Sequence, residues 1–210
     1  MLIDITRTLQ PGVAVWPGDT PFERRSVLRL ADGASVNLST LLMSAHTGTH
    51  ADAPRHFTDD GPSLEALDLE PYWGRAQVVT ITKERGALTP EDFSRADLSR
   101  APRLLVRSGS SGRDPGTFGR DIVYPGPDLA AFLGEKGVVL YGSDAPSVDH
   151  PDSKTLPGHH ALFARGIAIL ENLELSRAPD GLYELAALPL KVRDGDGSPV
   201  RAALRALEGR

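Results

Sequence analysis

Two short stretches of the chain hold all six of its histidines. Residues 46–57 read HTGTHADAPRHF and place three imidazoles and one carboxylate within eleven residues: His46, His50, Asp52 and His56. A second window of eleven residues holds the remaining histidines: His150, His159 and His160. Because imidazole and carboxylate groups are common metal ligands, the two clusters predict one shared metal site.

The backbone of residues 46–57 must turn to bring its own ligands together. All four side chains have even numbers, so a straight strand would place them on one face. At about 3.3 Å per residue, however, His46 and His56 would then lie about 33 Å apart, too far for one small site. Gly48 permits unusual backbone angles, and Pro54 interrupts a regular strand or helix. We therefore expect a compact loop that winds the imidazoles around one point.

The absence of cysteine restricts a transition-metal site in this chain to nitrogen and oxygen ligands. Two histidines and Asp52 form a suitable set of zinc ligands. A carboxylate has two oxygens, so Asp52 could bridge two metal ions about 3.5–4 Å apart that share a hydroxide, a strong nucleophile at neutral pH. The sequence thus indicates metal-assisted hydrolysis.

Glu171 is a further ligand candidate, because it ends the apolar run 167–170. A carboxylate there is costly to bury unless it is paired or metal-bound, and the alternative is that it emerges into water. His159 and His160 are adjacent and would point about 100° apart on a helix, so one of them would enter a given site. Residue spacing does not choose between them.

Other polar residues and one aromatic residue have two interpretations. Trp16 lies in a rigid Trp-Pro-Gly-Asp turn, where it either anchors the loop on the core or offers a flat face to an aromatic ligand. The long loop 143–156 carries Asp144, Asp149 and His150, which we expect to be loop residues at the surface. No G-x-S-x-G nucleophile elbow is present, which disfavours a serine hydrolase.

The elements that must position these side chains are mostly strands. The patterns predict strands at residues 2–9, 22–30, 36–45, 77–82, 103–107, 137–142, 166–171, 183–190 and 200–207. Short helices are predicted at residues 63–69, from Thr89 onward, at 127–133 and at 159–165. Because strands outnumber helices, we predict one α/β domain over residues 1–210 with a mixed or largely antiparallel sheet system.

Composition excludes several classes of protein. The formal net charge of −5 argues against a nucleic-acid binder. No apolar run approaches the roughly 20 residues that a membrane-spanning helix needs. The N-terminus lacks the pattern of a signal peptide, so a cytoplasmic protein is the default expectation.

Several motifs together resemble the metal-dependent cyclase-like hydrolase family, and most closely its formamidase branch. The resemblance covers nearly the whole chain, and its central motif is H-x-G-T-H-x-D-x-P-x-H at residues 46–56. The other matching segments are residues 15–21, 142–147, 153–155, 168–171, 183–190 and 198–201. The tryptophan loop and the C-terminal segment favour the formamidase branch.

This resemblance implies a swivelling β/β/α-type fold, a homodimer and two zinc ions per subunit. It implies that Asp52 and Glu171 bridge the two ions and that the remaining ligands are His46, His50 and His159. His56 would be the catalytic acid/base, and Trp16 would contact the substrate. His160 is then the neighbour of a ligand rather than a ligand.

The activity that the resemblance implies is hydrolysis of a small-molecule aryl formamide. The expected substrate is N-formyl-L-kynurenine, and its products are L-kynurenine and formate, a step in tryptophan degradation. Two alternatives stay open. One is a related amide or lactam hydrolase such as an isatin hydrolase, which Thr49 would also suit. The other is a non-catalytic metal-binding protein.

Overall fold

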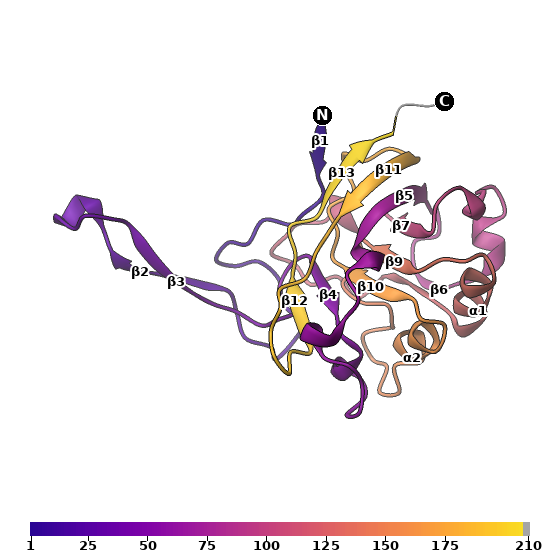
Figure 1. Cartoon of the computed structure of the whole chain (residues 1–210), viewed down its shortest axis with the longest axis horizontal. Helices are drawn as coiled ribbons and strands as arrows, with labels where there is room; N and C mark the ends of the chain where they lie inside the picture. The colour runs from indigo at the N-terminus through magenta and orange to yellow at the C-terminus, as the bar shows by residue number, and fades with distance from the viewer. Residues whose placement is uncertain (208–210) are drawn as a thin grey trace.

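Nine strands form the central sheet of the protein (Figure 1). The computed structural model describes residues 1–207. The strands follow one another across the sheet in this order: β1 (Leu2–Asp4), β13 (Ala203–Ala206), β11 (Gly181–Ala186), β5 (Trp73–Thr80), β7 (Arg103–Arg107), β9 (Leu140–Ser143), β10 (Ala168–Glu171), β4 (His50–Asp52) and β12 (Gly197–Pro199). The two ends of the chain therefore supply the strands at one edge of the sheet.

The sheet is mixed, as the sequence predicts. Strands β5, β7, β9 and β10 run parallel to one another. The strands on both flanks of this group pair antiparallel: β1, β13 and β11 on one side, β4 and β12 on the other. A parallel centre requires crossover connections, and these carry the helices α1 (Pro127–Glu135) and α2 (Pro157–Ala164).

The central strands bury both faces of the sheet, because alternate side chains enter two different hydrophobic clusters. In β7, Leu105 packs in one cluster while Leu104 and Val106 pack in the other. The cluster of Leu104 also contains Leu129 of α1 and Leu162 of α2, so both helices cover that face. The cluster of Leu105 is closed by β11, β13 and the segment after β10. Such two-sided burial is typical of parallel strands.

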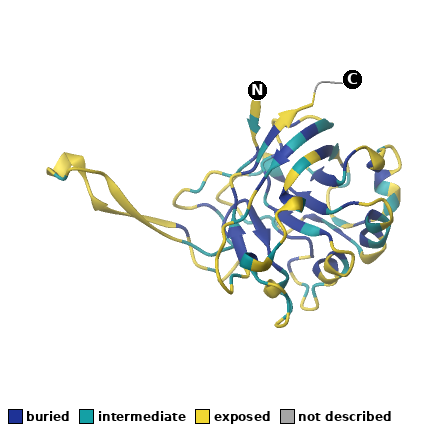
Figure 2. Ribbon diagram, viewed as in Figure 1, coloured by how far each residue is buried: buried dark blue, intermediate teal, exposed yellow. Residues whose placement is uncertain are grey.

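Two smaller strand pairs lie outside the central sheet. β6 (Gly86–Leu88) and β8 (Val123–Pro125) pair in parallel. β2 (Glu23–Leu28) and β3 (Leu38–Leu42) form an antiparallel hairpin that projects away from the body of the protein (Figure 1). Every residue of β2 and β3 is exposed (Figure 2). We call residues 23–42 the arm.

Short 3-10 helices complete the described chain: η1 (Leu30–Asp32), η2 (Pro54–His56), η3 (Leu64–Ala66), η4 (Glu70–Tyr72), η5 (Pro90–Phe93), η6 (Leu98–Arg100) and η7 (Ser110–Gly112). The helix predicted from Thr89 is η5, where the side chains of Thr89 and Asp92 form a capping box. Within residues 1–207, the helices all fall short of the length and apolarity needed to cross a membrane.

Several sequence predictions need correction. The expected loop over residues 46–57 is partly regular, because His50–Asp52 is a buried strand, β4, that pairs with both β10 and β12. The sequence does not predict strand β12, because Gly-Ser-Pro is typical of a turn. The predicted helix at 63–69 contains only the 3-10 turn η3. The strand predicted at 2–9 ends at Asp4. Pairing with strands that are distant in the sequence determines the structure of these short segments. The local sequence does not reveal this pairing.

Substitutions of a buried leucine and of a half-exposed leucine should differ clearly in their effect on stability. Leu105→Ala removes a side chain that is fully buried at the centre of the sheet, and it should lower the free energy of unfolding by about 2–5 kcal/mol. The control Leu69→Ala changes a side chain that is half exposed, and it should stay within about 0.5 kcal/mol of wild type. Urea unfolding followed by circular dichroism measures both, and equal effects would contradict the assigned core.

Candidate metal centre

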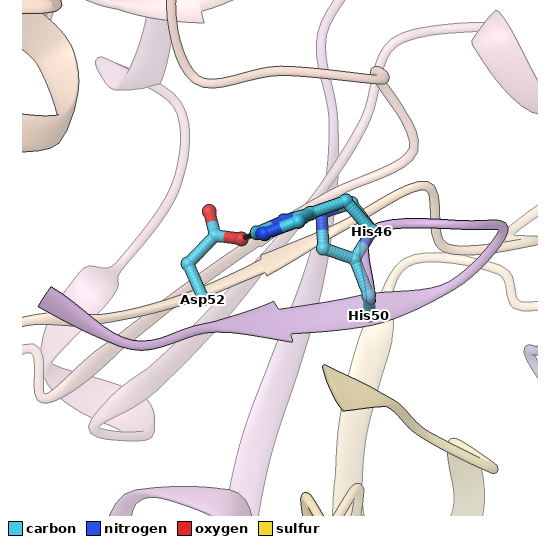
Figure 3. A group of neighbouring side chains, drawn as sticks. All are labelled: His46, His50 and Asp52. Atoms are coloured by element: carbon cyan, nitrogen blue, oxygen red, sulfur yellow. Dashed lines mark hydrogen bonds and ion pairs between the residues drawn. The ribbon is translucent and has the colours of Figure 1, made fainter. Parts of the chain in front are cut away.

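The candidate metal centre is built where β4 meets β10. Alternation along β4 directs His50 and Asp52 to the same side of the sheet. Glu171 ends β10 and stands directly opposite His50 in the antiparallel register. Gly48, with a φ of 67°, turns the chain just before β4, and His46 folds back over the strand. Figure 3 shows the imidazoles of His46 and His50 both directed at Asp52.

The fifth predicted ligand arrives from α2. His159 lies in the first turn of this helix and is buried. Its Nε2 lies 3.5 Å from Oδ2 of Asp52 and 3.7 Å from Oε1 of Glu171. The structure therefore brings all five predicted ligands together, and it places His159 rather than the exposed His160 among them.

The carboxylates of Asp52 and Glu171 lie between His46 and His50 on one side and His159 on the other. One oxygen of Asp52, Oδ1, lies 3.0 Å from Nδ1 of His46 and 3.3 Å from Nε2 of His50. The latter nitrogen also lies 3.3 Å from Oε2 of Glu171. The second oxygen of each carboxylate faces His159. Each carboxylate thus presents one oxygen to each of two neighbouring positions, which is the arrangement that a bridging ligand needs.

The residues fit a metal ion by their chemistry and their burial. Oδ2 of Asp52 is buried and has no hydrogen-bond donor, and a buried polar atom without a partner is costly. Among residues 1–207, three groups of ligand atoms lie mutually within 4.8 Å. The first comes from His46, His50 and Asp52, the second from Asp52, His159 and Glu171, and the third, which is more exposed, from His46, His56 and Asp196. The first two groups share Asp52.

The electrostatics of the centre favour positive charge. Burial disfavours an imidazolium, yet hydrogen bonds to Asp52 and Glu171 raise the pKa of His50 to about 10. Burial acts in the same way on His159, but its hydrogen bond to Asp149 and the nearby carboxylates of Asp52 and Glu171 raise its pKa to about 10. Burial alone would raise the pKa of Asp52, and the surrounding histidines hold it well below its usual value. Two buried carboxylates therefore attract either protons or metal cations.

Asp149 fixes the orientation of His159. It is buried, contrary to the sequence expectation of a surface loop residue. Its Oδ2 accepts hydrogen bonds from Nδ1 of His159 at 2.7 Å and from the backbone N–H of His159 at 3.0 Å, and Oδ1 accepts one from Gly158 N–H at 2.8 Å. A carboxylate behind a metal-binding histidine sets its tautomer. Sequence analysis missed this role because Asp149 lies ten residues from His159 in an irregular loop.

Three other candidates lie outside the group of five. Asp144 is buried, but its carboxylate accepts hydrogen bonds from backbone and side-chain donors of Ser108 and Ser111, so it shapes that loop. His150 is exposed, as expected, and its Nδ1 accepts the backbone N–H of Asp152 at 3.1 Å. His160 is also exposed, and its ring packs edge-on against Phe57.

His56 stands at the rim of the centre. It follows Pro54 in η2, and its ring lies 4.0 Å from the ring of His46 between centroids. Its Nδ1 lies 3.9 Å from Oδ2 of Asp196, a residue that the sequence did not single out. Burial lowers the pKa of His56. This imidazole therefore lies beside the five candidate ligands, where it could accept a proton.

A cavity of about 360 Å³ opens onto the metal centre. His50, His159 and Glu171 line its base together with His56. Trp16 lines it as well, where its ring packs edge-to-face on Phe118 at 5.1 Å between centroids. Trp16 remains 40% exposed, so it does not serve mainly as a core anchor. The cavity is therefore lined both by aromatic rings and by candidate metal ligands.

Comparison with known proteins identifies the family. Residues 3–150 match the Cyclase family, described as "Putative cyclase". A kynurenine formamidase from Salinibacter ruber (strain DSM 13855 / M31) is 46% identical over 206 residues, which are 97% of each chain. A kynurenine formamidase from Bacillus mycoides (strain KBAB4) is 45% identical over 203 residues, covering 97% of this chain and 96% of the relative.

Solved structures agree with the sequence relatives. Isatin hydrolase A from Labrenzia aggregata superposes with a TM-score of 0.85 at 27% identity, covering 99% of this chain and 94% of that one. A predicted metal-dependent hydrolase from Bacillus stearothermophilus superposes with a TM-score of 0.82 at 27% identity, covering 97% of both chains.

The fold and the matches define an enzyme of the metal-dependent hydrolase class. The chain belongs to the cyclase family and, within it, to the group of the kynurenine formamidases. The resemblance inferred from the sequence motifs is therefore confirmed.

The bond between Asp149 and His159 yields a prediction for metal affinity. Asp149→Ala removes the carboxylate that orients His159, and it should weaken zinc binding by about 10- to 100-fold. Competition with a chromophoric chelator measures the affinity. Asp152→Ala, which changes an exposed carboxylate of the same loop, is the matched control and should bind zinc like wild type. Equal affinity of both variants would contradict the positioning role.

Proposed function

We propose that the protein is a zinc-dependent arylformamidase that hydrolyses N-formyl-L-kynurenine to L-kynurenine and formate. One observation carries the proposal: two buried carboxylates, Asp52 and Glu171, each face His50 on one side and His159 on the other, beside a cavity with an aromatic wall. The names of the near-full-length relatives support the substrate.

The five clustered residues would hold two zinc ions. His46 and His50 would serve one ion, His159 would serve the other, and Asp52 and Glu171 would bridge both. Zinc bound there supplies a hydroxide nucleophile at neutral pH and stabilises negative charge on the carbonyl oxygen. The protein contributes a buried, preorganised ligand set, since Asp149 and the N–H of Val148 already hold His159 and Glu171 in place.

His56 would act as the catalytic acid/base. Its ring lines the cavity beside the ligands, where it can take a proton during attack on the formyl carbon and return it to the departing aniline nitrogen. That transfer breaks the C–N bond and leaves a neutral amine and formate. His56 suits this role because it lies next to the ligand cluster without joining the buried carboxylates.

Trp16 and Phe118 would hold the aromatic part of the substrate. Their rings meet edge-to-face at the cavity wall, and aromatic rings favour offset or edge contacts with another ring. A cavity of about 360 Å³ lies within the range of small-molecule sites. An aryl group placed against Trp16 would direct its formamide toward the metal ligands.

A related ring-opening activity is the second candidate. The structural similarity to isatin hydrolase A supports it at the level of fold. Thr49 does not separate the two substrates, because its hydroxyl donates to the backbone O of Asn172 at 2.6 Å and accepts the N–H of Arg7 at 2.9 Å. The higher identity to the kynurenine formamidases favours the formamide.

The arm supports the proposed homodimer. Its apolar side chains are exposed: Val27, Leu28, Leu30, Val36, Leu38, Leu41 and Leu42. A two-stranded hairpin alone is at best marginally stable in water, and contiguous exposed apolar side chains mark interaction sites. We propose that a second copy of the chain covers the arm.

We also propose that residues 1–210 form one catalytic domain of the swivelling β/β/α type.

The activity assay tests the proposed function directly. Purified protein loaded with zinc should hydrolyse N-formyl-L-kynurenine, lose the activity with a chelator and regain it with zinc. Absorbance of the released kynurenine follows the reaction, and isatin is the comparison substrate. A higher kcat/KM for isatin would favour the second candidate, and no hydrolysis of either substrate by zinc-loaded protein would contradict both.

His56→Ala tests the proton role. The variant should retain bound zinc, yet kcat should fall by about 100-fold or more, because general acid–base catalysis contributes that much. His150→Ala changes an exposed histidine that contacts Asp152 and the ring of Tyr124 and does not line the cavity, so it should turn over like wild type. Near-wild-type kcat in metal-loaded His56→Ala would show that another group moves the proton.

Sedimentation velocity tests the homodimer. Wild-type protein should sediment at twice the chain mass of 22.5 kDa. Leu38→Lys and Leu41→Lys add charge to the exposed apolar side chains of the arm, and the double variant should sediment at the mass of one chain. Leu69→Lys, outside the arm, is the control and should keep the wild-type mass. A wild-type monomer, or a dimeric arm variant, would refute the arm as the interface.

A further inference from the structure

Asp196 lies beside the candidate metal centre without belonging to the five clustered ligands. It directly precedes β12, in which Gly197 pairs with Asp52. Its backbone carbonyl accepts the N–H of Ala53 at 2.9 Å. These backbone bonds tie residue 196 to the junction between β4 and η2, the two elements that carry His50 and His56. The position of Asp196 is therefore set by the same strand pairing that builds the centre.

The carboxylate of Asp196 reaches two imidazoles at once. Its Oδ2 lies 3.2 Å from Nε2 of His46, within hydrogen-bond distance, and 3.9 Å from Nδ1 of His56. The two rings lie 4.0 Å apart between centroids with an interplanar angle of 35°. A single oxygen thus faces one predicted metal ligand and the predicted proton carrier.

The His46 ring packs closely against Gly197. A Cβ at this position would lie 2.5 Å from Cε1 of His46 and 2.7 Å from its Nε2. The imidazole therefore packs directly on the backbone of residue 197, and no larger residue fits there. Backbone contact fixes the plane of the ring, while Asp196 fixes the direction of Nε2.

A hydrogen bond from Nε2 of His46 to Asp196 would leave Nδ1 as the nitrogen that can bind a metal. A neutral imidazole carries one N–H donor and one acceptor nitrogen. When Nε2 donates its proton to Asp196, the lone pair stays on Nδ1, the nitrogen that faces Oδ1 of Asp52 at 3.0 Å. A carboxylate on the outer nitrogen of a metal-binding histidine is a recurrent device that sets the tautomer and the ring orientation.

We propose that Asp196 is a positioning residue that holds His46 for metal binding and His56 for proton transfer. The inference rests on the proposed function, since it takes His46 as a ligand and His56 as the acid/base. It adds a residue to the site whose single carboxylate couples the two, so that loss of Asp196 affects metal affinity and turnover together.

The test compares Asp196→Ala and Asp196→Asn with wild type. Zinc affinity is measured by competition with a chelator, and kcat and KM for N-formyl-L-kynurenine are measured at saturating zinc. Asp196→Ala should bind zinc about 10- to 100-fold more weakly, and kcat should remain reduced when zinc is saturating, with KM unchanged. Asp196→Asn keeps an acceptor oxygen of the same shape, so it should recover part of both losses.

Asp194 provides the matched control. It lies in the same turn, and its contacts with Glu65 run through its backbone N–H, so Asp194→Asn should match wild type in zinc affinity and turnover. Thermal melts check that all variants fold. Wild-type values for Asp196→Ala in an active enzyme would overturn the proposal while leaving the proposed function intact. A loss of one whole bound zinc per chain would instead make Asp196 a ligand and would also overturn it.

Discussion

The carboxylates of Asp52 and Glu171 are buried close together. Their burial is costly, and the other residues of the site offset this cost. An ionised carboxylate is costly to bury unless it is paired or bound to a metal, and these two side chains are only 1% and 6% exposed. Three histidines surround them, and a backbone N–H donates to Glu171. The need for positive charge between these oxygens explains why ligand-type residues converge there.

Strand register and the position of α2 bring these candidate ligands together. Because β4 pairs antiparallel with β10, His50 stands opposite Glu171, and Asp52 follows on the same face. The crossover after β9 brings Asp149 and then α2 over the sheet, so His159 enters from the other side. On the remaining flank β12 pairs with β4 and places Asp196 next to His46. Rigid paired elements, rather than loops alone, therefore hold the candidate ligands.

The sequence predicts the parts of this site that are close together or strongly patterned. The density of histidines in residues 46–57 predicts a metal site with Asp52 among its ligands, and the position of Glu171 at the end of an apolar strand makes it a candidate. The family resemblance, rather than the spacing, assigns His46, His50, His159 and Glu171 as the other ligands. Asp149 and Asp196 escaped prediction, since each acts on a histidine through a contact that the folded chain alone creates. The sequence predicts a loop where β4 lies, because its three residues become a regular strand only through pairing with two neighbouring strands. The swivelling β/β/α assignment remains a prediction.

We propose that Asp52 and Glu171 bridge two zinc ions. Anomalous diffraction at the zinc edge, from crystals of the protein grown with zinc, tests it most directly. We expect two anomalous peaks per chain, one beside His46 and His50 and the other beside His159, with Asp52 and Glu171 between them. Zinc bound only at other residues, or no anomalous peak at this centre in crystals that contain zinc elsewhere, would contradict the account.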